Sequence, residues 1–385
     1  MKNQNKMKKW IKKKLINHLD KVSENNDLFY KRVDRIAYKY DLKRRAEKSN
    51  KRGACYGYAS LTMEEINAIK EIWGNYGGKY QAFGFYKQFC GSFNPYFVPD
   101  DYYDFAEHVF NLRWSAYFLQ HKCNLKYILP SQNRAKVILQ KIDGHLVYED
   151  NTEITEQEAI ACLKKHPIFM AKIARGTWGG KGVQRIVLDE IKDVDSFLRE
   201  LLLPIDIEFE EVVKQNDFLA QFNPDSVNTL RFVTLNINRK CTVLSTFLRM
   251  GAKGSCVDNL NGGNGVLVGV NSNGVLNDFG VDKNFEKKYE SPTGVKFLNV
   301  SIPDFDRIKQ QIIEFHKKIP FANLIGWDVT IDTEGNPIVI EVNLDTAVIE
   351  AHQVFNGPIF GDRLDEVREY IEKRKPLLKH QMMTY

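Results

Sequence analysis

The sequence predicts an α+β protein in which a mostly helical first part precedes a strand-rich second part. Apolar residues at helical spacing, together with helix-start signals, run from residue 61 to about residue 121. From Pro167 onward, short apolar runs separated by glycine-rich turns are typical of strands. The 385 residues are 43% hydrophobic and 27% charged, which is the ordinary balance of a globular protein. The length favours two or three domains.

Composition sets aside secreted and integral-membrane proteins. No stretch approaches the roughly 18 consecutive apolar residues of a membrane span, and the lysine-rich start leads into no apolar run of the kind a signal peptide needs. The cysteines are scattered without a CxxC pair, so we expect reduced thiols in a cytoplasm rather than disulfides or zinc. They are Cys55, Cys90, Cys123, Cys162, Cys241 and Cys256.

The first 52 residues are strongly basic, with 18 Lys and Arg against 6 Asp and Glu. Within residues 1–22, apolar residues follow helical spacing and lysines fill much of the remaining surface. Such a helix can sit on an anionic membrane surface, at the inner face of the plasma membrane; alternatively it packs on the body with its lysines solvated. We expect no nucleic-acid partner, because aromatic residues are not interleaved with the basic ones at the spacing typical of nucleic-acid-binding proteins. The apolar positions are Met7, Ile11, Leu15, Leu19 and Val22.

Local signals place the other elements. Residues 28–48 continue as helix, and Thr62 followed by Glu64 and Glu65 begins another that Gly74 ends. Pro99-Asp100-Asp101 opens the next helix. Asp143-Gly144 between two apolar runs predicts a hairpin over 135–148. Thr155 with Glu158 forms a capping-box pattern, and further helices are predicted near 188–203, 303–318 and 361–374.

A glycine-rich hairpin follows an apolar strand that carries one lysine, Lys172. The strand at 168–173 runs into Gly176-Thr177-Trp178-Gly179-Gly180-Lys181-Gly182 and then a second strand, 184–188. Glycines let backbone amides approach phosphate oxygens, and lysines supply neutralising charge. Neither a P-loop nor a Rossmann loop is present. The hairpin is therefore either a plain turn or a flap that closes over a nucleotide.

A second hairpin brings acidic residues together. If its turn is centred between Glu334 and Gly335, Asp328 lies directly across from Glu341, and alternation places Asn343 on the face of Glu341. Two opposed carboxylates repel without a cation, and hard oxygen donors suit Mg²⁺. The alternative is a polar strand facing solvent, which the flanking Ile and Val residues disfavour.

Two arginines lie on apolar strand faces, Arg231 with Val233 and Arg249 with Phe247. A buried guanidinium needs an anionic partner. A carboxylate of the protein would satisfy each arginine, and so would a phosphate or acyl phosphate. Further on, residues 258–265 (DNLNGGNG) form a loop that is a plain connection or orients a polar substrate.

These features occur in an order that resembles the ATP-grasp superfamily. SVNTLR, the FLRMG…VDN…GG run, SPTG, GWDVT and IEVN look more closely like the sugar-transfer-associated ATP-grasp family of bacterial polysaccharide clusters, over about residues 55–360. The resemblance implies two α+β lobes that sandwich a nucleotide, preceded by a mostly helical region. The segments would be 1–52 (basic helical), 53–165 (pre-grasp), 166–218 (lobe with flap and hinge) and 219–385 (catalytic lobe).

The resemblance also implies roles for individual residues. Lys122 and Lys172 would contact nucleotide phosphates, under a flap that includes Gly179, Gly180, Lys181 and Gly182. The hinge Glu210-Glu211-Val212-Val213 would read the adenine edge. Mg²⁺ would be held by Asp328, Glu341 and Asn343. Arg231 and Arg249 would face the transferred phosphoryl group, with Asn228 beside them at the catalytic centre. Gln215-Asn216 stands where the family has Gln-His, and Ser291 replaces a His before Pro-Thr-Gly.

By this resemblance the chain is an ATP- and Mg²⁺-dependent carboxylate–amine ligase that forms an amide through an acyl phosphate. Its substrates would be a carboxylate and an amine on a sugar or amino sugar, in capsular or exopolysaccharide synthesis. One alternative is an ATP-grasp kinase that phosphorylates a hydroxyl. Another is a nucleotide-binding regulator without turnover. A lipid-linked acceptor would give residues 1–22 a purpose at the membrane surface.

Overall fold

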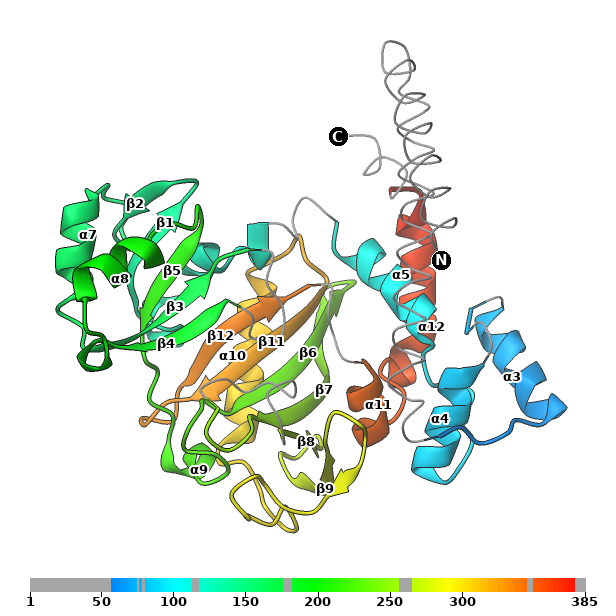
Figure 1. Ribbon diagram of the computed structural model, residues 1–385. Helices are drawn as coiled ribbons and strands as arrows, with labels where there is room; N and C mark the ends of the chain where they lie inside the picture. The colour runs from blue at the N-terminus through cyan, green and yellow to red at the C-terminus, as the bar shows by residue number, and fades with distance from the viewer. Residues whose placement is uncertain are drawn as a thin grey trace, which may run out of the picture.

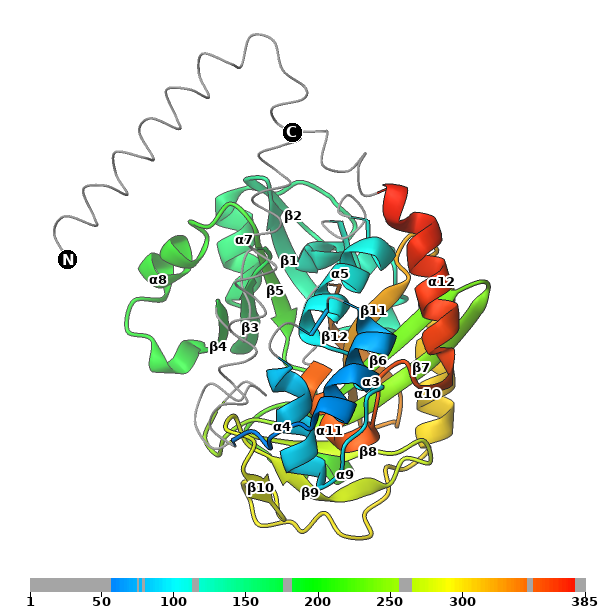
Figure 2. The same ribbon diagram turned by 90° about the vertical axis from the view of Figure 1, so that its right-hand side faces the viewer.

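The computed structural model describes residues 57–74, 76–77, 80–112, 118–175, 182–255, 265–344 and 349–377. The basic segment 1–52 and the predicted helix at 28–48 lie outside these residues. Within the described ranges, no helix is both long and apolar enough to cross a bilayer. The described elements form two antiparallel sheets with helices packed on their faces (Figures 1 and 2).

The smaller sheet has five strands in the order β2-β1-β5-β3-β4. One face packs on helices α7 (Glu156–Leu163) and α8 (Val194–Leu201) through a core that includes Leu139, Phe169 and Phe209. Alternation therefore turns Gln140, Lys172 and Glu208 to the opposite face. The strands are β1 (Val137–Ile142), β2 (His145–Val147), β3 (Ile168–Ile173), β4 (Val183–Val187) and β5 (Ile207–Glu211).

The larger sheet has seven strands in the order β10-β9-β8-β7-β6-β11-β12. All its neighbouring pairs are antiparallel, and most connect strands that follow each other in the chain. The strands are β6 (Thr229–Ile237), β7 (Lys240–Met250), β8 (Val266–Val270), β9 (Leu276–Val281), β10 (Lys287–Lys288), β11 (Leu324–Ile331) and β12 (Pro337–Asn343).

Both faces of the larger sheet are covered, which explains why β11 is buried along its whole length. On one face, Phe232, Trp327 and their neighbours form a core with α10 (Phe305–Lys317). On the other face, Val233, Leu235 and Phe247 belong to an aromatic-rich core, which is completed by described helices that precede and follow the strands in sequence. Those helices are α4 (Gln81–Cys90), α5 (Asp100–Phe110), α11 (Ile349–Asn356) and α12 (Leu364–Arg374), with α3 (Met63–Trp73) outside them (Figure 1).

Short elements complete the chain. The 3₁₀ turns η1 (Lys122–Tyr127) and η2 (Ser131–Asn133) precede β1, and η3 (Leu188–Glu190) follows β4. Helix α9 (Asp217–Ala220) follows β5 and precedes β6 in the sequence. The turns η5 (Gly361–Arg363) and η6 (Lys375–Leu377) flank α12.

The local sequence signals are confirmed where the structure describes them. Thr62 and Thr155 both form complete capping boxes, and Pro99 precedes the first residue of α5. Asp143 and Gly144 both adopt positive φ in the turn of the β1–β2 hairpin, which is the geometry that the Asp-Gly pair predicts. Helices α8, α10 and α12 fall within the predicted ranges.

The boundary expected at residues 165/166 divides a single sheet. Strands β1 and β2, placed by sequence in segment 53–165, belong to the same sheet as β3 and β4: β2 pairs with β1, and β1 pairs with β5. Strand β1 pairs with β2 on one side and with β5 on the other, so it lies inside this sheet and not at its edge. The lobe therefore begins before residue 137, and α7 is one of the helices that cover it.

Candidate active site

The predicted site residues come from two sheets that meet along the β11–β12 hairpin. The small lobe contacts this hairpin through the residues just before β1. There Asn133 Nδ2 donates to the Pro337 carbonyl at 3.2 Å, and the backbone of Arg134 forms an isolated β-bridge with Val339. After the predicted hinge, the backbone of Gln215 forms an isolated β-bridge with Asp332, and the Asn216 N–H donates to the Ile331 carbonyl at 2.8 Å. Figure 1 shows the small lobe beside β11 and β12. The hairpin thus belongs to both halves of the site.

The acidic residues of this hairpin lie in the predicted register. Asp328 pairs with Glu341 across the two strands, and Asn343 pairs with Gly326 two positions along. A register shift directly after Asp328 ends the regular alternation there. The three side chains therefore share one face of the sheet at one end of the hairpin.

Asp328 forms ion pairs with both predicted arginines. It lies opposite Arg231 on β6, whose Nε bonds Oδ1 and whose Nη2 donates to Oδ2 at 2.8 Å. Arg249 Nη1 donates to Oδ2 at 2.9 Å from β7. Burial alone would raise the pKa of Asp328, but the two guanidinium groups outweigh it and hold the pKa at about 2. Of the alternatives left open by sequence, the structure shows an ion pair within the protein.

Glu341 and Asn343 are the most available of the three predicted metal ligands. The Glu341 side chain is 36% exposed, and its Oε1 lies 3.2 Å from Lys122 Nζ. Asn343 Nδ2 approaches Asp328 Oδ2 at 3.4 Å. Asp328 Oδ1 accepts from Arg231, and Oδ2 accepts from both arginines and from Asn343. Carboxylate and amide oxygens on one rigid face fit Mg²⁺.

The described residues contain no group of three or more His, Cys, Asp and Glu side chains that could hold a metal. An ion at this position would therefore depend on the amide of Asn343 and on ligand oxygens, in addition to the carboxylates. That is the way Mg²⁺ is usually bound next to nucleotide phosphates.

The two predicted phosphate-binding lysines come from the small lobe, and each has a carboxylate partner. Lys122 begins η1, and its backbone N–H donates to the Ala174 carbonyl at 3.0 Å just after β3. Lys172 on β3 forms a buried ion pair with Glu210. Burial lowers the pKa of Lys172, but Glu210 and Glu208 outweigh this effect and raise the pKa above its usual value. Both lysines are therefore already paired with a carboxylate in this structure.

The predicted hinge begins at the end of β5. Glu210 and Glu211 are the last residues of that strand, and residues 212–214 lead on to α9. Their side chains diverge, since Glu210 binds Lys172 on one face while Glu211 binds the exposed amine of Lys136 at 2.6 Å. Val213 lies in the connecting segment, half-buried.

Asn228 is fully buried, and its amide group organises the loop before β6. Its Nδ2 donates to the carbonyls of Leu219 and Asn223, both at 2.8 Å, and to Gln215 Oε1 at 3.1 Å. Its Oδ1 has no hydrogen-bond partner among the described residues. The structure thus gives Asn228 a role in loop architecture, and its catalytic role stays a prediction.

Part of the predicted flap lies outside the described residues, including Gly179, Gly180 and Lys181. The same holds for most of the loop at 258–265. Gly182 is described: it has a φ of +73° and its carbonyl accepts from the Ile173 N–H at 2.8 Å, which closes the base of the β3–β4 hairpin.

Sequence reasoning missed several buried polar groups close to these residues. Gln140 and Glu208 align with Lys172 across β1, β5 and β3. Tyr103 on α5 and His352 on α11 are fully buried near the charge of Arg231, and their Oη and Nε2 atoms have no hydrogen-bond partner in the described part of the chain. Only Glu208 had a readable signal, because it shares a strand face with Glu210.

Fold and site together define an ATP-grasp protein. The sequence model of the family described as sugar-transfer-associated ATP-grasp matches residues 138–369, more than half of the chain. The chain belongs to this family. Comparison with curated proteins found no match.

Several solved structures are similar at low sequence identity. The ATP-grasp ligase PsnB with a minimal precursor is 12% identical, with a TM-score of 0.38 and coverage of 68% of this chain and 64% of that one. N5-carboxyaminoimidazole synthetase from Staphylococcus aureus, complexed with ADP, is 12% identical with a TM-score of 0.37, and covers 63% and 52%. The biotin carboxylase domain of Hydrogenobacter thermophilus 2-oxoglutarate carboxylase, with MgADP, is 12% identical with a TM-score of 0.38, and covers 64% and 46%. The chain thus spans about half to two thirds of the length of these proteins.

Proposed function

We propose that this chain is an ATP- and Mg²⁺-dependent carboxylate–amine ligase that modifies a sugar or amino sugar in surface polysaccharide synthesis. The observation that supports it most is the set of ion pairs at the junction of the two sheets. Lys122 with Glu341, Lys172 with Glu210, and Arg231 and Arg249 with Asp328 place cations and anions side by side. Mg·ATP carries both signs of charge and is suited to exchange partners with such pairs.

The acid substrate must be activated, because a carboxylate is a poor electrophile. Its oxygen attacks the γ-phosphorus of ATP, the bond to the β-phosphate oxygen breaks, and an acyl phosphate and ADP result. The amine then attacks the acyl carbon, inorganic phosphate leaves, and the amine loses a proton. Mg²⁺, when bound, supplies charge neutralisation for the phosphates.

The side chains have distinct tasks in this scheme. Lys122 and Lys172 bind phosphate oxygens as point charges, and Glu341 with Asn343 supplies oxygen ligands for the metal. Arg231 and Arg249, fixed by Asp328, face the charge that develops on the transferred phosphoryl group and on the tetrahedral oxyanion. Closure of the glycine-rich hairpin would exclude water, which otherwise hydrolyses an acyl phosphate.

Thermal unfolding with a non-hydrolysable ATP analogue, with and without Mg²⁺, tests the nucleotide site. A ligand at about a hundred times its dissociation constant stabilises the native state by about 2.7 kcal/mol. We expect a Mg²⁺-dependent rise in the unfolding midpoint that Glu341→Gln and Lys122→Met both lose. Glu334→Gln at the exposed tip of the same hairpin is the matched control and should keep the rise.

The product identifies the reaction. With panels of uronic acids, amino acids and amino sugars, ADP release together with an amide detected by mass spectrometry supports a ligase. A phosphorylated hydroxyl product would instead show the kinase. No midpoint shift in any protein would mean that the hairpin is structural, and the enzyme proposal would be abandoned.

A further inference from the structure

Four polar side chains form a buried row across the small sheet, on the face opposite α7 and α8. Gln140 on β1 pairs in register with Glu208 on β5, and Glu208 pairs with Lys172 on β3. Glu210 follows Glu208 on the same face. Their exposed fractions are 0% for Gln140, 3% for Glu208, 5% for Glu210 and 7% for Lys172. So much buried polarity requires compensating contacts.

The row contains two carboxyl groups, Glu208 and Glu210, but only one cation, Lys172, to balance their charge. Lys172 forms its ion pair with Glu210. Glu208 receives the Gln140 Nε2 donor, which also reaches the Cys123 carbonyl at 3.2 Å, and lies within hydrogen-bonding reach of Glu210. One lysine therefore serves two adjacent carboxyl groups, and two like charges in this position would repel.

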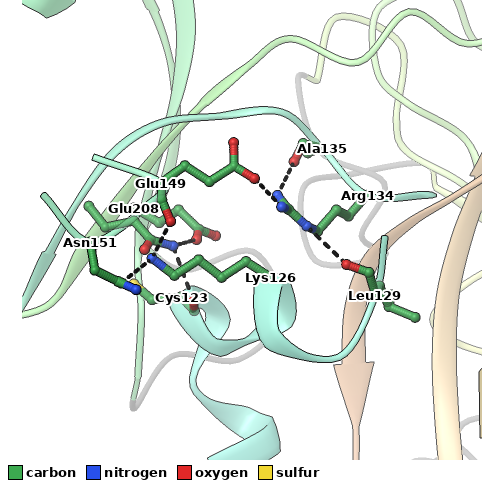
Figure 3. Close-up of polar contacts among 9 residues, drawn as sticks. Cys123, Lys126, Leu129, Arg134, Ala135, Glu149, Asn151 and Glu208 are labelled. Carbon is green, nitrogen blue, oxygen red and sulfur yellow. Dashed lines mark hydrogen bonds and ion pairs between the residues drawn. The ribbon is translucent and has the colours of Figure 1, made fainter. Parts of the chain in front are cut away.

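The other charged groups that face Glu208 do not remove this imbalance. Turn η1 packs over Glu208 with Cys123 and Lys126. Figure 3 shows the Lys126 amine directed to the Glu149 carbonyl and to Asn151 Oδ1, at 2.9 and 2.7 Å. In the same view Arg134 binds the Glu149 carboxylate. Lys126, the cation of η1 near Glu208, is thus bound to other acceptors, and so is Arg134 beside Lys126.

We propose that Glu208 is protonated and positions Lys172: its carboxyl O–H donates to Glu210, Gln140 fixes its other oxygen, and Glu210 holds the lysine amine on this face. This inference rests on the proposed function, because it assumes that Lys172 binds nucleotide phosphates. In this arrangement Glu208, Glu210 and Lys172 all have partners and only one negative charge remains in the row. Gln140 Oε1 has no hydrogen-bond partner among the described residues.

The electrostatics of the row agree with this assignment. Burial raises the pKa of Glu208 to about 8, and the neighbouring Glu210 carboxylate adds to the effect. Glu208 therefore keeps its proton at neutral pH and loses it above about pH 8. An ionised Glu208 would compete with the nucleotide for Lys172, so nucleotide affinity should fall as pH rises through this range.

Two substitutions of Glu208 separate a proton-bearing role from simple packing. Glu208→Gln keeps the shape, donates an N–H to Glu210 and cannot ionise, whereas Glu208→Ala removes the link. By isothermal titration with MgADP, we expect Glu208→Gln to bind within about twofold of wild type at pH 7 and to lack the weakening above pH 8. Loss of a buried hydrogen bond predicts about tenfold weaker binding for Glu208→Ala at both pH values. Glu190→Gln, on the surface of the same lobe, should behave as wild type.

Infrared difference spectra of the ligand-free protein provide an independent measurement. A protonated-carboxyl band that titrates near pH 8 and is missing in Glu208→Gln supports the inference. Its absence at neutral pH, or equal binding losses in Glu208→Gln and Glu208→Ala, would overturn it. If the band is present but the wild-type protein binds no MgADP, the proposed function is contradicted, whereas the protonation of Glu208 is still supported.

Discussion

Asp328 binds two guanidinium groups from two different strands, and this arrangement could not be read from the sequence. The Asp328–Glu341 register follows from the turn residues of one local hairpin. The contact with Arg231 and Arg249 depends on the strand order β7-β6-β11, in which β6 and β11 pair residues about 90 to 100 positions apart. Composition and alternation indicated that each arginine needs an anion, but not which anion is present.

Replacing Asp328 by Asn should therefore destabilise the protein strongly. Both arginines are mostly buried, and breaking a buried ion pair on one side leaves uncompensated charge, at about 3–5 kcal/mol. We expect the free energy of unfolding in urea at pH 7 to fall by that amount. Asp362→Asn, at an exposed position, should change it by less than about 0.5 kcal/mol.

The pH dependence of this difference has a defined sign. The pKa of Asp328 is about 2 in the folded chain and near 3.9 in an unfolded one. Its stabilisation is therefore present above about pH 4 and is lost as pH falls through about 2. The difference between wild type and Asp328→Asn should shrink over that interval. A difference that stays constant from pH 4 to pH 2 would show that the arginines are held by other groups.

At the scale of elements, short-range signals predicted starts and turns well, because capping boxes and Asp-Gly turns act within a few residues. They could not show that β1 and β2 join β3–β5, since an antiparallel partner about 70 residues away leaves no local mark. Nor could they show how closely α11 packs on the larger sheet. That packing depends on Gly269 in β8.

Gly269 lets α11 approach β8 without a side chain between them. A Cβ atom there would overlap with Phe355 Cβ and lie 2.7 Å from both Phe355 Cγ and Asn277 Nδ2. Overpacking of this kind costs about 1–3 kcal/mol, so Gly269→Ala should lower the free energy of unfolding by that amount. Gly326→Ala is the matched strand control, because its nearest contact would be at 3.4 Å; it should cost less than about 1 kcal/mol.

A double-mutant cycle locates the effect of Gly269→Ala. If α11 is the obstacle, the substitution should cost much less in a Phe355→Gly background, since the overlapping Cβ atom and the ring are then both absent. Equal costs in both backgrounds would assign the destabilisation to β8 itself and not to the seating of α11.

At the scale of the whole molecule, the helices that precede the family match are part of the core on one face of the larger sheet. The match begins at residue 138, yet α4 and α5 share one hydrophobic core with β6, β7 and α11. Gln353 on α11 accepts from the Val98 N–H at 2.8 Å and donates to Tyr86 Oη at 2.8 Å. The sequence indicated an aromatic-rich helical region here, but its burial against the strands became visible only with the fold.

Asn111, at the end of α5, allows a direct test of whether these helices and the larger sheet form one folding unit. Its Nδ2 donates to the carbonyls of Leu324 and Leu344 at 2.6 and 2.8 Å, and its Oδ1 accepts from the N–H groups of Asn323 and Leu324 at 3.0 and 3.1 Å. Asn111→Leu would leave these buried backbone groups unpaired, so we expect a loss of about 3 kcal/mol or more in unfolding free energy. Asn273→Leu, at an exposed turn, is the control.

Hydrogen exchange measured across the denaturant transition then shows whether Asn111→Leu destabilises α5 and β11 together. If α5 and β11 belong to one cooperative unit, peptides from both should lose protection together in wild type and earlier, but still together, in Asn111→Leu. Separate transitions, with α4 and α5 opening first while β11 stays protected, would make the helical region an independent attachment. The shared core argues for joint unfolding, because neither partner can expose its half of the aromatic cluster without exposing the other's.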